Sequence, residues 1–419
     1  MELVGHISLT CNKINIDRNY LILKYKVKRM IYVTNKNIGL TGGGDAVVAM
    51  EIINSLHSSG LDVASVSMKY QIPKSINETF SSIKNFRLPF IPEKEKYSKQ
   101  KFGALKYFLK NSESLIKQAI LKRQLSKTPP KVIITNDLLT GRYLLKKYRD
   151  SVKIIQVVHN IPSFFEDLKD EDLNDHFDYY NRVDRVIFVS DVNRKKWLSY
   201  EKLDENKTSY IYNCANESLA KKVLRDSKST VRKRLKMNPD KFYLVTVASL
   251  NPQKGLDYLM EAAPKLKEIA PNLGILVIGA ENTAYETFLK DKSDEKIKDV
   301  VKFLGFKSNA MEYVYASDAF ILPSRAEGFP LVILEAMVVN TPVLASRVGG
   351  IPEMLDHERT GLLFESGNNE ELIKCFKRMY LNQDDRNRYA DQASKKYWEK
   401  FSKRNFTEQY VELIKNLGQ

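Results

Sequence analysis

Cysteine and long apolar segments are both scarce in this 419-residue sequence. Its 3 cysteines, Cys11, Cys214 and Cys375, are far apart and show no metal-ligand or redox spacing, so we expect reduced thiols. No run reaches the roughly 18–20 apolar residues that a membrane-spanning helix needs. The N-terminal stretch MELVGHISLTCNKINIDRNY also lacks the apolar core of a signal peptide. These absences predict a cytoplasmic protein.

Charge is abundant and unequal in sign. The chain has 67 Lys and Arg against 51 Asp and Glu, a formal net charge of +16. This excess favours anionic partners such as nucleotides, phosphorylated acceptors, anionic lipid surfaces or nucleic acid. The hydrophobic content of 43% is ordinary for a globular protein, and the length suits two domains with separate cores.

The most informative stretch reads DAFILPSRAEGFPLVILEAMVVNTPVLASRVGGIPEML. Its pattern predicts a strand over Ala319–Leu322, a helix over Leu331–Val339 and a second strand over Pro342–Ser346. Gly349 and Gly350 follow the second strand, and we expect them to let the backbone approach a ligand. Both loops lie at the carboxyl ends of parallel strands, where open α/β sheets bind ligands.

Two carboxylates stand out in this stretch. Glu327 lies in the first loop, and Glu335 is the lone charge of the helix Leu331–Val339. A carboxylate in so apolar a helix needs hydrogen-bond partners, and a sugar diol offers two donors for its two oxygens. The alternative is structural: Glu335 caps the neighbouring loop and Glu327 is solvated. The spacing alone leaves both interpretations open.

A resemblance bears on this choice. Glu327 and Glu335, with seven residues between them and followed by EAM, TPVLAS and GGIPE, resemble the glutamate pair of family-four retaining glycosyltransferases. The resemblance implies an α/β protein of the GT-B fold, with two doubly wound Rossmann-like domains facing a cleft. It also implies transfer of a sugar from a nucleotide-diphosphate-sugar donor to a glycan or lipid-linked saccharide, as in bacterial surface polysaccharide biosynthesis.

The resemblance begins near Met30, where the first convincing strand starts. We therefore expect residues 1–29 to be an appendage or an over-extended start. The remaining divisions are an acceptor-side domain at 30–213, an inter-domain connection at 214–240, a nucleotide-sugar-binding domain at 241–400, and a helix at 401–419 that packs back on the first domain. The strand and helix alternation of both halves agrees with two doubly wound domains.

The resemblance also implies roles for single residues. Lys254 matches a lysine that grips the donor diphosphate, but Ser249 stands where the family has an arginine, for which Arg325 or Arg347 is a candidate substitute. His159, in VVHN, matches a histidine that faces the donor sugar. The predicted catalytic residues are Glu327, His159 and Lys254. The predicted donor-binding residues are Lys254, Lys307, Gly328, Phe329, Pro330, Leu331 and Glu335, where Glu335 holds the ribose.

Purely structural interpretations exist for these positions. A histidine just past a buried strand is often a hydrogen-bonded core residue, and Lys254 precedes a turn glycine as an ordinary surface lysine would. The run Gly42-Gly43-Gly44 is no dinucleotide fingerprint because Val47 takes the third glycine position. By itself it reads as a tight turn. The resemblance implies that Gly43 and Gly44 form an acceptor or phosphate loop.

The region Lys94–Lys127 is basic and amphipathic. Either it is a surface helix with a solvated basic face, or it rests on an anionic membrane and brings the protein to the inner face of the plasma membrane. The literal D-x-D at Asp170-Glu171-Asp172 lies in a polar stretch, so we interpret it as a solvated face. We accordingly expect no metal and no cofactor beyond the nucleotide-sugar co-substrate.

Three rival functions remain open at this point. A nucleotide-sugar epimerase shares the broad fold and could use the same carboxylates. A non-catalytic sugar-binding protein would be compatible with Ser249. A nucleic-acid-binding protein would explain the charge of +16, but the sequence shows no recognisable binding module, so we predict no nucleic-acid partner.

Overall fold

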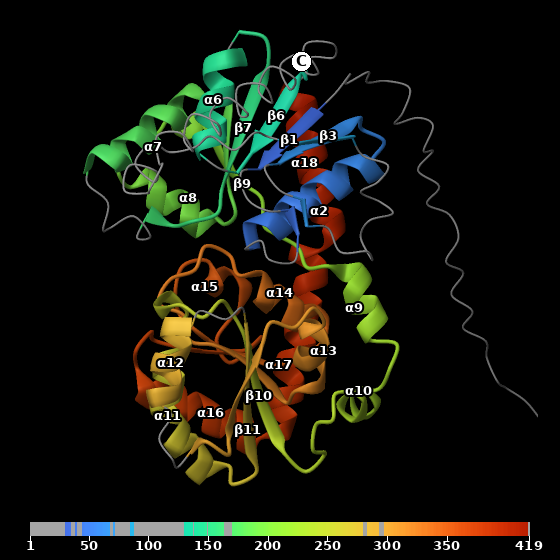
Figure 1. Cartoon of the computed structure of the whole chain (residues 1–419), viewed down its shortest axis with the longest axis vertical. Coiled ribbons are helices and arrows are strands. Elements are labelled where there is room, and N and C mark those ends of the chain that lie inside the picture. Colours follow the sequence, from blue (N-terminus) through green and yellow to red (C-terminus); the bar gives the residue numbers. More distant parts are fainter. Residues whose placement is uncertain are drawn as a thin grey trace, which may run out of the picture.

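The computed structural model describes residues 30–34, 38–39, 44–67, 70–71, 84–87, 130–136, 138–148, 150–162, 170–279, 283–292 and 297–417. The predictions made for residues 1–29, Gly43 and Lys94–Lys127 lie outside these ranges. Two α/β domains lie one above the other along the long axis of the molecule (Figure 1). Within the described ranges, no helix combines the length and the apolar character needed to cross a bilayer.

The N-terminal domain is built on a seven-stranded parallel sheet. In sheet order its strands are β5 (Lys84–Arg87), β3 (Val63–Ser67), β1 (Met30–Thr34), β6 (Val132–Thr135), β7 (Lys153–Val158), β8 (Arg185–Phe188) and β9 (Thr208–Tyr210). Its helices are α2 (Gly44–Ser58), α6 (Leu138–Tyr148), α7 (Asp170–Arg182) and α8 (Asp191–Leu198). A small separate sheet pairs β2 (Ile38–Gly39) with β4 (Tyr70–Gln71). Strands β6 and β7 are apolar runs buried almost throughout, as parallel strands covered on both faces are.

The C-terminal domain is built on a six-stranded parallel sheet. In sheet order its strands are β12 (Val301–Gly305), β11 (Leu273–Ile278), β10 (Phe242–Val247), β13 (Ala319–Leu322), β14 (Val343–Ser346) and β15 (Leu362–Phe364). Its helices are α9 (Glu217–Val223), α10 (Lys228–Arg234), α11 (Leu256–Ile269), α12 (Thr283–Lys292), α13 (Ala310–Ala316), α14 (Leu331–Val338), α15 (Ile351–Met354), α16 (Asn369–Leu381) and α17 (Gln383–Lys396). The connection helices α9 and α10 both pack on α13.

Both sheets reverse their strand order at one point. The chain starts in the middle of each sheet, builds outwards to one edge, and then returns to build the other edge. The reversal falls between β1 and β6 in the first domain and between β10 and β13 in the second. In a doubly wound sheet, the loops at the carboxyl ends of the two strands beside this point diverge and leave room for a ligand. The predicted pair of doubly wound domains is confirmed.

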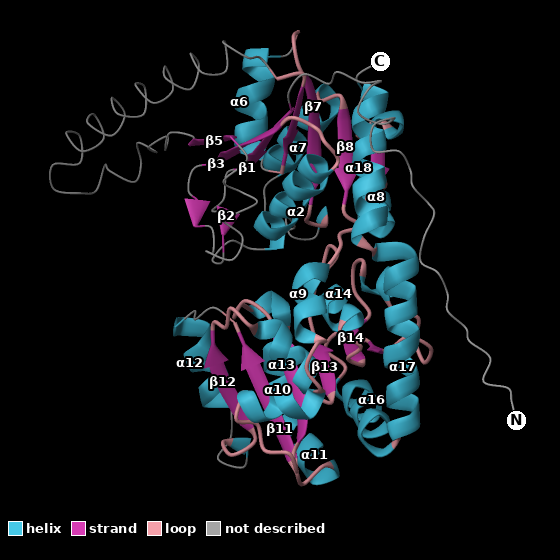
Figure 2. Cartoon of the chain, turned by 90° about the vertical axis from the view of Figure 1, so that its right-hand side faces the viewer, coloured by secondary structure: helices cyan, strands magenta, loops and turns pink. Residues whose placement is uncertain are grey.

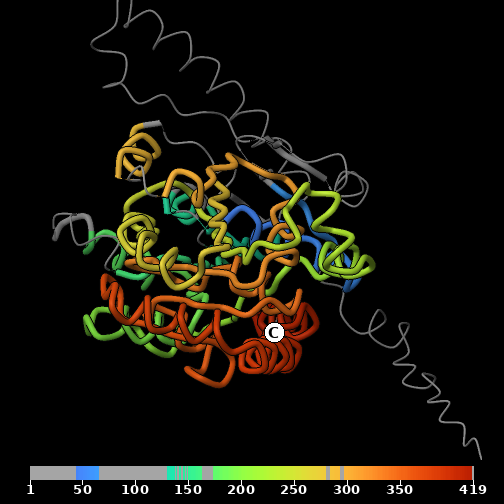
Figure 3. Tube along the Cα trace, turned by 90° about the horizontal axis from the view of Figure 1, so that it is seen from below, coloured from blue at the N-terminus to red at the C-terminus, as the bar shows by residue number. Residues whose placement is uncertain are grey.

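The chain crosses between the domains a second time near its C-terminus. A π-helical turn, Tyr397–Phe401, leads from α17 into α18 (Lys403–Leu417), which packs against α2 of the N-terminal domain (Figure 2). Lys403 forms an ion pair with Glu51 of α2. Seen from below, the C-terminal helices gather along one side of the molecule (Figure 3). The two domains are therefore linked on this side by helix packing as well as by chain connectivity.

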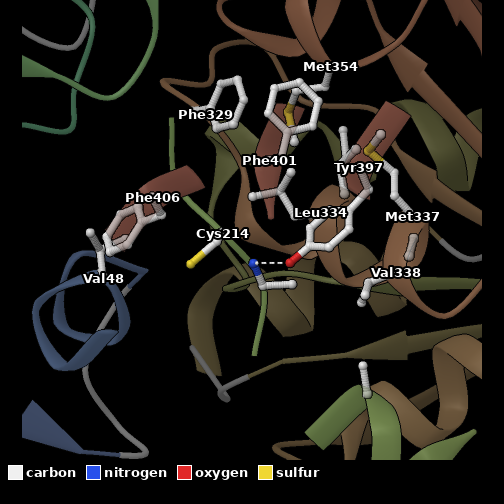
Figure 4. Packing of buried hydrophobic residues seen from close by; sticks show 14 of the residues in the cluster. Val48, Cys214, Phe329, Leu334, Met337, Val338, Met354, Tyr397, Phe401 and Phe406 are labelled. Atoms are coloured by element: carbon white, nitrogen blue, oxygen red, sulfur yellow. Dashed lines mark hydrogen bonds between the residues drawn. The ribbon is translucent and has the colours of Figure 1, made fainter. Parts of the chain in front are cut away.

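A hydrophobic cluster continues from one domain into the other through this crossing. It includes Val48 of α2, Phe329 of the C-terminal domain, and Phe406 of α18 (Figure 4). The first crossing between the domains is the segment between β9 and α9, which contains Ala215. The hydroxyl of Tyr397 accepts a hydrogen bond from the backbone N–H of Ala215 at 3.2 Å. The two crossings thus touch each other, and the junction between the domains is a packed core.

Candidate functional site

A cavity of about 1220 Å³ lies between the two domains. On the N-terminal side it is lined by the start of α2, by the ends of β6 and β7, and by α7. On the C-terminal side it is lined by the loops after β10, β11, β12 and β13 and by α14. Because the carboxyl edges of both sheets border it, the predicted cleft is present, and it meets both points of strand reversal.

Lys254 and Glu327 form an ion pair at the reversal point of the C-terminal sheet. Lys254 ends a short helical turn, Pro252–Lys254, after β10, and Glu327 lies in the loop after the neighbouring strand β13. The Lys254 Nζ lies 2.7 Å from Glu327 Oε1. Ser324 Oγ donates to the same oxygen at 2.6 Å. Glu327 is only 5% exposed, so its charge is held by defined donors and not by bulk water.

The loop that carries Glu327, residues 323–330 (the glutamate loop), is held in place by the strand beside it. Ser346, at the end of β14, donates to the carbonyl oxygen of Ser324 at 2.6 Å. Gly349 has a left-handed φ of 51°, and a Cβ there would lie 1.6 Å from the carbonyl oxygen of Glu327. Only glycine fits this position. Among the described residues, Gly349 and Gly350 therefore let the backbone approach the glutamate loop, where the sequence had suggested a ligand.

Glu335 faces the cavity from α14, eight residues after Glu327 in the chain. Its carboxylate has no hydrogen-bond partner within the part of the chain that the structure describes. Burial raises the pKa of Glu335 to about 7. The structural alternative, in which Glu335 caps a loop and Glu327 is solvated, is wrong on both points. A ligand with two hydroxyl donors would supply what the Glu335 carboxylate lacks.

His159 lies where the N-terminal domain contacts the glutamate loop. It directly follows β7 and lines the cavity. A Cβ on Gly328 would lie 1.9 Å from the carbonyl oxygen of His159, so the backbones of the two domains meet here. Any side chain at position 328 would push the domains apart. His159 and Glu327 are thus brought to the same part of the cavity by a contact between domains.

Ser249 also lines the cavity, and the described residues that line the cavity include no arginine. It is exposed, and its Oγ accepts a hydrogen bond from Asn251 Nδ2 at 2.9 Å. Within the described ranges, the Lys and Arg side chains that line the cavity are Lys254 and Lys307. The position of the expected second cation is therefore occupied by a neutral hydroxyl and amide pair.

Neither candidate arginine replaces the missing cation. Arg325 binds both carboxylate oxygens of Asp257, at 2.8 and 2.6 Å, and its guanidinium lies over the ring of Tyr258. Arg347 pairs with Glu365 at 3.0 Å. The residues that line the cavity include neither arginine.

The remaining predicted residues that the structure describes also reach the cavity, whereas Gly43 lies outside the described ranges. The lining includes Gly44 of α2, the loop residues Gly328, Phe329, Pro330 and Leu331, and Lys307 beside Phe306 after β12. Gly44 lies close to Leu331 across the domain gap, since a Cβ on Gly44 would be 3.7 Å from the Leu331 side chain. The described residues predicted for the donor and for the acceptor loop thus line one common cavity.

Comparison with known proteins finds a family match in the second half of the chain. Residues 227–396 match the model of the family described as Glycosyl transferases group 1. The match runs from just before α10 to the last residue of α17. An uncharacterized glycosyltransferase of Methanocaldococcus jannaschii is 29% identical over 235 residues, 55% of this chain and 60% of that protein. The lipopolysaccharide core biosynthesis mannosyltransferase LpsB of Rhizobium meliloti is 30% identical over 152 residues, 35% of this chain and 43% of that protein. The matches span about half the length of these relatives.

The whole described architecture has a solved counterpart. The Anabaena protein HepE, crystallised with UDP, superposes with a TM-score of 0.72 at 18% sequence identity, covering 93% of this chain and 100% of that one. Similarity at this level of identity establishes the fold. The two facing Rossmann-like domains are the GT-B fold, and the matched residues 227–396 lie in its C-terminal half.

The sequence interpretation missed one wall of the cavity. His176 and Tyr180 of α7 line it opposite the C-terminal domain, within and just after the stretch interpreted from the sequence as polar and solvated. Phe177 and Tyr180 are buried, and the Tyr180 and Trp197 rings pack edge to face at 5.4 Å. The signal was present in the sequence: His176 and Tyr180 are four residues apart and so share one helix face. The adjacent D-x-D begins this same helix.

Proposed function

We propose that the protein is a retaining glycosyltransferase that moves a sugar from a nucleotide-diphosphate-sugar donor to a saccharide acceptor. The observation that carries the proposal is the Lys254–Glu327 pair, which lies at the reversal point of the C-terminal sheet and faces His159 across the cavity. The group 1 glycosyl transferase match over residues 227–396 supports it.

The proposed mechanism assigns one task to each side of the donor. Lys254 offsets the negative charge that builds on the leaving diphosphate, helped by backbone N–H groups of the loop Gly328–Leu331. Such fixed donors stabilise a transition state because they need no reorganisation when the charge develops. Glu335 binds the ribose diol. Its ionised form is the better acceptor, so binding draws the proton from a carboxyl whose pKa is about 7.

Glu327 and His159 contact the transferred sugar from the two domains. Glu327 accepts a sugar hydroxyl with the oxygen that Lys254 and Ser324 leave free, and it stabilises positive charge at the anomeric carbon. His159 contacts the sugar from the opposite wall. The acceptor hydroxyl attacks on the same face as the departing diphosphate, so the anomeric configuration is retained. The bond from the anomeric carbon to the diphosphate oxygen breaks as the new glycosidic bond forms, and the acceptor proton passes to the leaving diphosphate.

The names of the relatives support a proposal for the acceptor and the setting. We propose a glycan or lipid-linked saccharide acceptor in surface polysaccharide biosynthesis, since LpsB is named for lipopolysaccharide core biosynthesis. We also propose that Lys94–Lys127 brings the enzyme to an anionic membrane surface. Sedimentation with anionic and with neutral liposomes tests this part, and equal binding to both would contradict it. Transfer is proposed to need no metal, so a chelator should leave the rate unchanged.

A donor screen tests the function itself. The full-length protein is heated with UDP-, GDP- and ADP-sugars, because a ligand that binds only the folded state raises the melting temperature. At 100 times Kd the expected stabilisation is about 2.7 kcal/mol. The stabilising donor is then incubated with simple glycosides, and free nucleoside diphosphate is measured. No stabilisation by any donor would refute the proposal, and an isomerised sugar without nucleotide release would show an epimerase.

A further inference from the structure

Glu353, the glutamate of GGIPE, lies in α15 of the C-terminal domain, and its carboxylate contacts the N-terminal domain. Its Oε1 accepts the backbone N–H of Val192 at 2.8 Å, and its Oε2 accepts that of Asp191 at 3.2 Å. These two residues begin helix α8. Oε2 also accepts the hydroxyl of Tyr212 at 2.6 Å. A carboxylate at a helix N-terminus satisfies amides that lack a partner within the helix and interacts well with the helix dipole.

The helix turn that Glu353 holds contacts both sides of the cavity. Ser190, the N-cap of α8, accepts the N–H of Asn193 at 3.1 Å and donates to the carbonyl oxygen of Gly328 at 3.3 Å. Asn193 Nδ2 lies 3.4 Å from the carbonyl oxygen of Val158, the residue before His159. Ser190 and Asn193 are fully buried. The first turn of α8 is thus hydrogen-bonded both to the glutamate loop and to the end of β7, the strand that His159 follows.

Tyr212 makes a second connection to the same loop. Its ring stacks on Phe329, with centroids 5.0 Å apart, and packs edge to face on Phe401 at 5.2 Å. Phe329 follows Gly328, and Phe401 lies in the second crossing between the domains (Figure 4). Asn213, next to Tyr212, donates to the carbonyl oxygen of Phe329 at 3.2 Å. The loop is therefore held to the first crossing by a stacked ring and by a hydrogen bond.

We propose that Glu353 is a positioning residue for sugar transfer. By holding the first turn of α8 and the hydroxyl of Tyr212, it fixes the spacing between His159 and the loop Glu327–Leu331. Glu353 does not line the cavity, so it acts through Ser190 and Phe329. Its effect on rate rests on the proposed function, whereas its effect on the junction between the domains does not. A displacement of about 1 Å at a reacting centre lowers rates by about a hundredfold.

Three variants separate positioning from general stability. Glu353→Ala removes all three hydrogen bonds, Glu353→Gln keeps one carbonyl acceptor, and Tyr212→Phe removes the hydroxyl while keeping the stacked ring. Glu371→Ala is the matched control, because Glu371 likewise accepts a backbone N–H, that of Glu365, at 2.8 Å, and it does not line the cavity. If Glu353→Ala fails to fold, Tyr212→Phe carries the test.

The kinetic readout is the division of the effect between kcat and KM. For the donor found in the screen, Glu353→Ala should lower kcat by about a hundredfold. The KM for the donor and the affinity for UDP, measured by calorimetry, should stay within about threefold, because Lys254 is untouched. Glu353→Gln should recover part of the loss, and Tyr212→Phe should lose about three- to tenfold in kcat. Glu371→Ala should match the wild type. An unchanged kcat in folded Glu353→Ala would overturn the proposal.

The structural readout needs no substrate. The N–H of Val189 bonds the carbonyl of Val158 at 3.3 Å, and the N–H of Gly350 bonds that of Gly328 at 3.1 Å. Residue-resolved hydrogen exchange of these two amides reports on the two sides of the cavity. Both should exchange at least about tenfold faster in Glu353→Ala. A change confined to Asp191 and Val192 would overturn the inference. A wild type that turns over no donor contradicts the proposed function alone, and hydrogen exchange then decides this inference.

Discussion

Lys254 Nζ and Glu327 Oε1 lie 2.7 Å apart although the two residues are separated by 73 positions in the chain. The cation assigned to the diphosphate and the carboxylate assigned to the sugar therefore form one ion pair. In the proposed mechanism a bound donor contacts Lys254 with its diphosphate and Glu327 with its sugar. Because Glu327 offsets the charge of Lys254, the positive charge at this site is smaller than the net charge of +16 over the whole chain would suggest.

We expect Glu327→Gln to fold normally and to lose most of its transfer activity. The amide keeps the hydrogen bond from Ser324, but it leaves Lys254 unpaired and cannot stabilise positive charge at the anomeric carbon. The loss in kcat should be about a hundred- to a thousandfold, as for other fixed electrostatic groups. Release of nucleoside diphosphate measures it. Lys307→Ala, which removes a lining lysine that is not part of this ion pair, is the comparison, and equal losses in both variants would contradict the role of Glu327.

The raised pKa of Glu335 predicts a pH dependence of nucleotide binding. The carboxyl is protonated more readily in the folded protein, about pKa 7 against 4.5, so in the free protein it costs stability as the pH rises through this interval. A ribose diol prefers the ionised form, so affinity for UDP should fall as the pH is lowered from 8 to 6. The fall approaches about tenfold per unit below the pKa.

The matched measurement for this pH effect uses Glu335→Gln. Because the phosphate of UDP also titrates in this range, only the difference between the wild type and this variant reports on Glu335. Calorimetric Kd values for UDP at three pH values give that difference. Parallel pH profiles for the two proteins would show that Glu335 does not bind the nucleotide. In the absence of ligand, Glu335→Gln should also gain stability relative to the wild type as the pH rises.

Gly349→Ala should disturb the glutamate loop. The new Cβ would collide with the carbonyl oxygen of Glu327, in addition to the left-handed strain of about 1–2 kcal/mol. Gly367→Ala is the control, since Gly367 also has a positive φ, of 81°, but its nearest neighbour is the end of a Tyr258 side chain at 3.3 Å. Thermal unfolding should show the larger loss in Gly349→Ala, and only that variant should lose transfer activity. Equal losses of stability would refute the steric argument.

Ser249→Arg should tighten the binding of a nucleoside diphosphate. Ser249 is exposed in the cavity, so an arginine there adds a cation without displacing a core side chain. We expect about a tenfold lower Kd for UDP, because hydrogen bonds to a charged group contribute roughly 1.5–3 kcal/mol. The gain should shrink at high salt, as screening of exposed charges requires. Ser249→Ala should leave the Kd nearly unchanged, and an arginine variant that binds no tighter would contradict the assigned position of the diphosphate.

Much of the fold could be predicted from local patterns. The strands Ala319–Leu322 and Met30–Thr34 and the helix after Pro330 follow from apolar periodicity and from proline placement, which depend only on neighbouring residues. The loops after the strands could be named as the ligand side because parallel strands all end at one edge. The paired glutamates stood out as carboxylates in an apolar stretch, whereas Lys254 was named by the family resemblance alone.

Other features were decided by which strands and domains become neighbours. The partner of Lys254, the contact of Gly328 with His159 and the lack of a hydrogen-bond partner for Glu335 within the described ranges have no local signature in the chain. Glu353 looked like the end of a glycine motif, yet its hydrogen bonds go to residues more than a hundred positions away. Sequence pattern fixes the elements because it acts over a few residues, whereas the site forms where two sheets reverse their order and two domains meet.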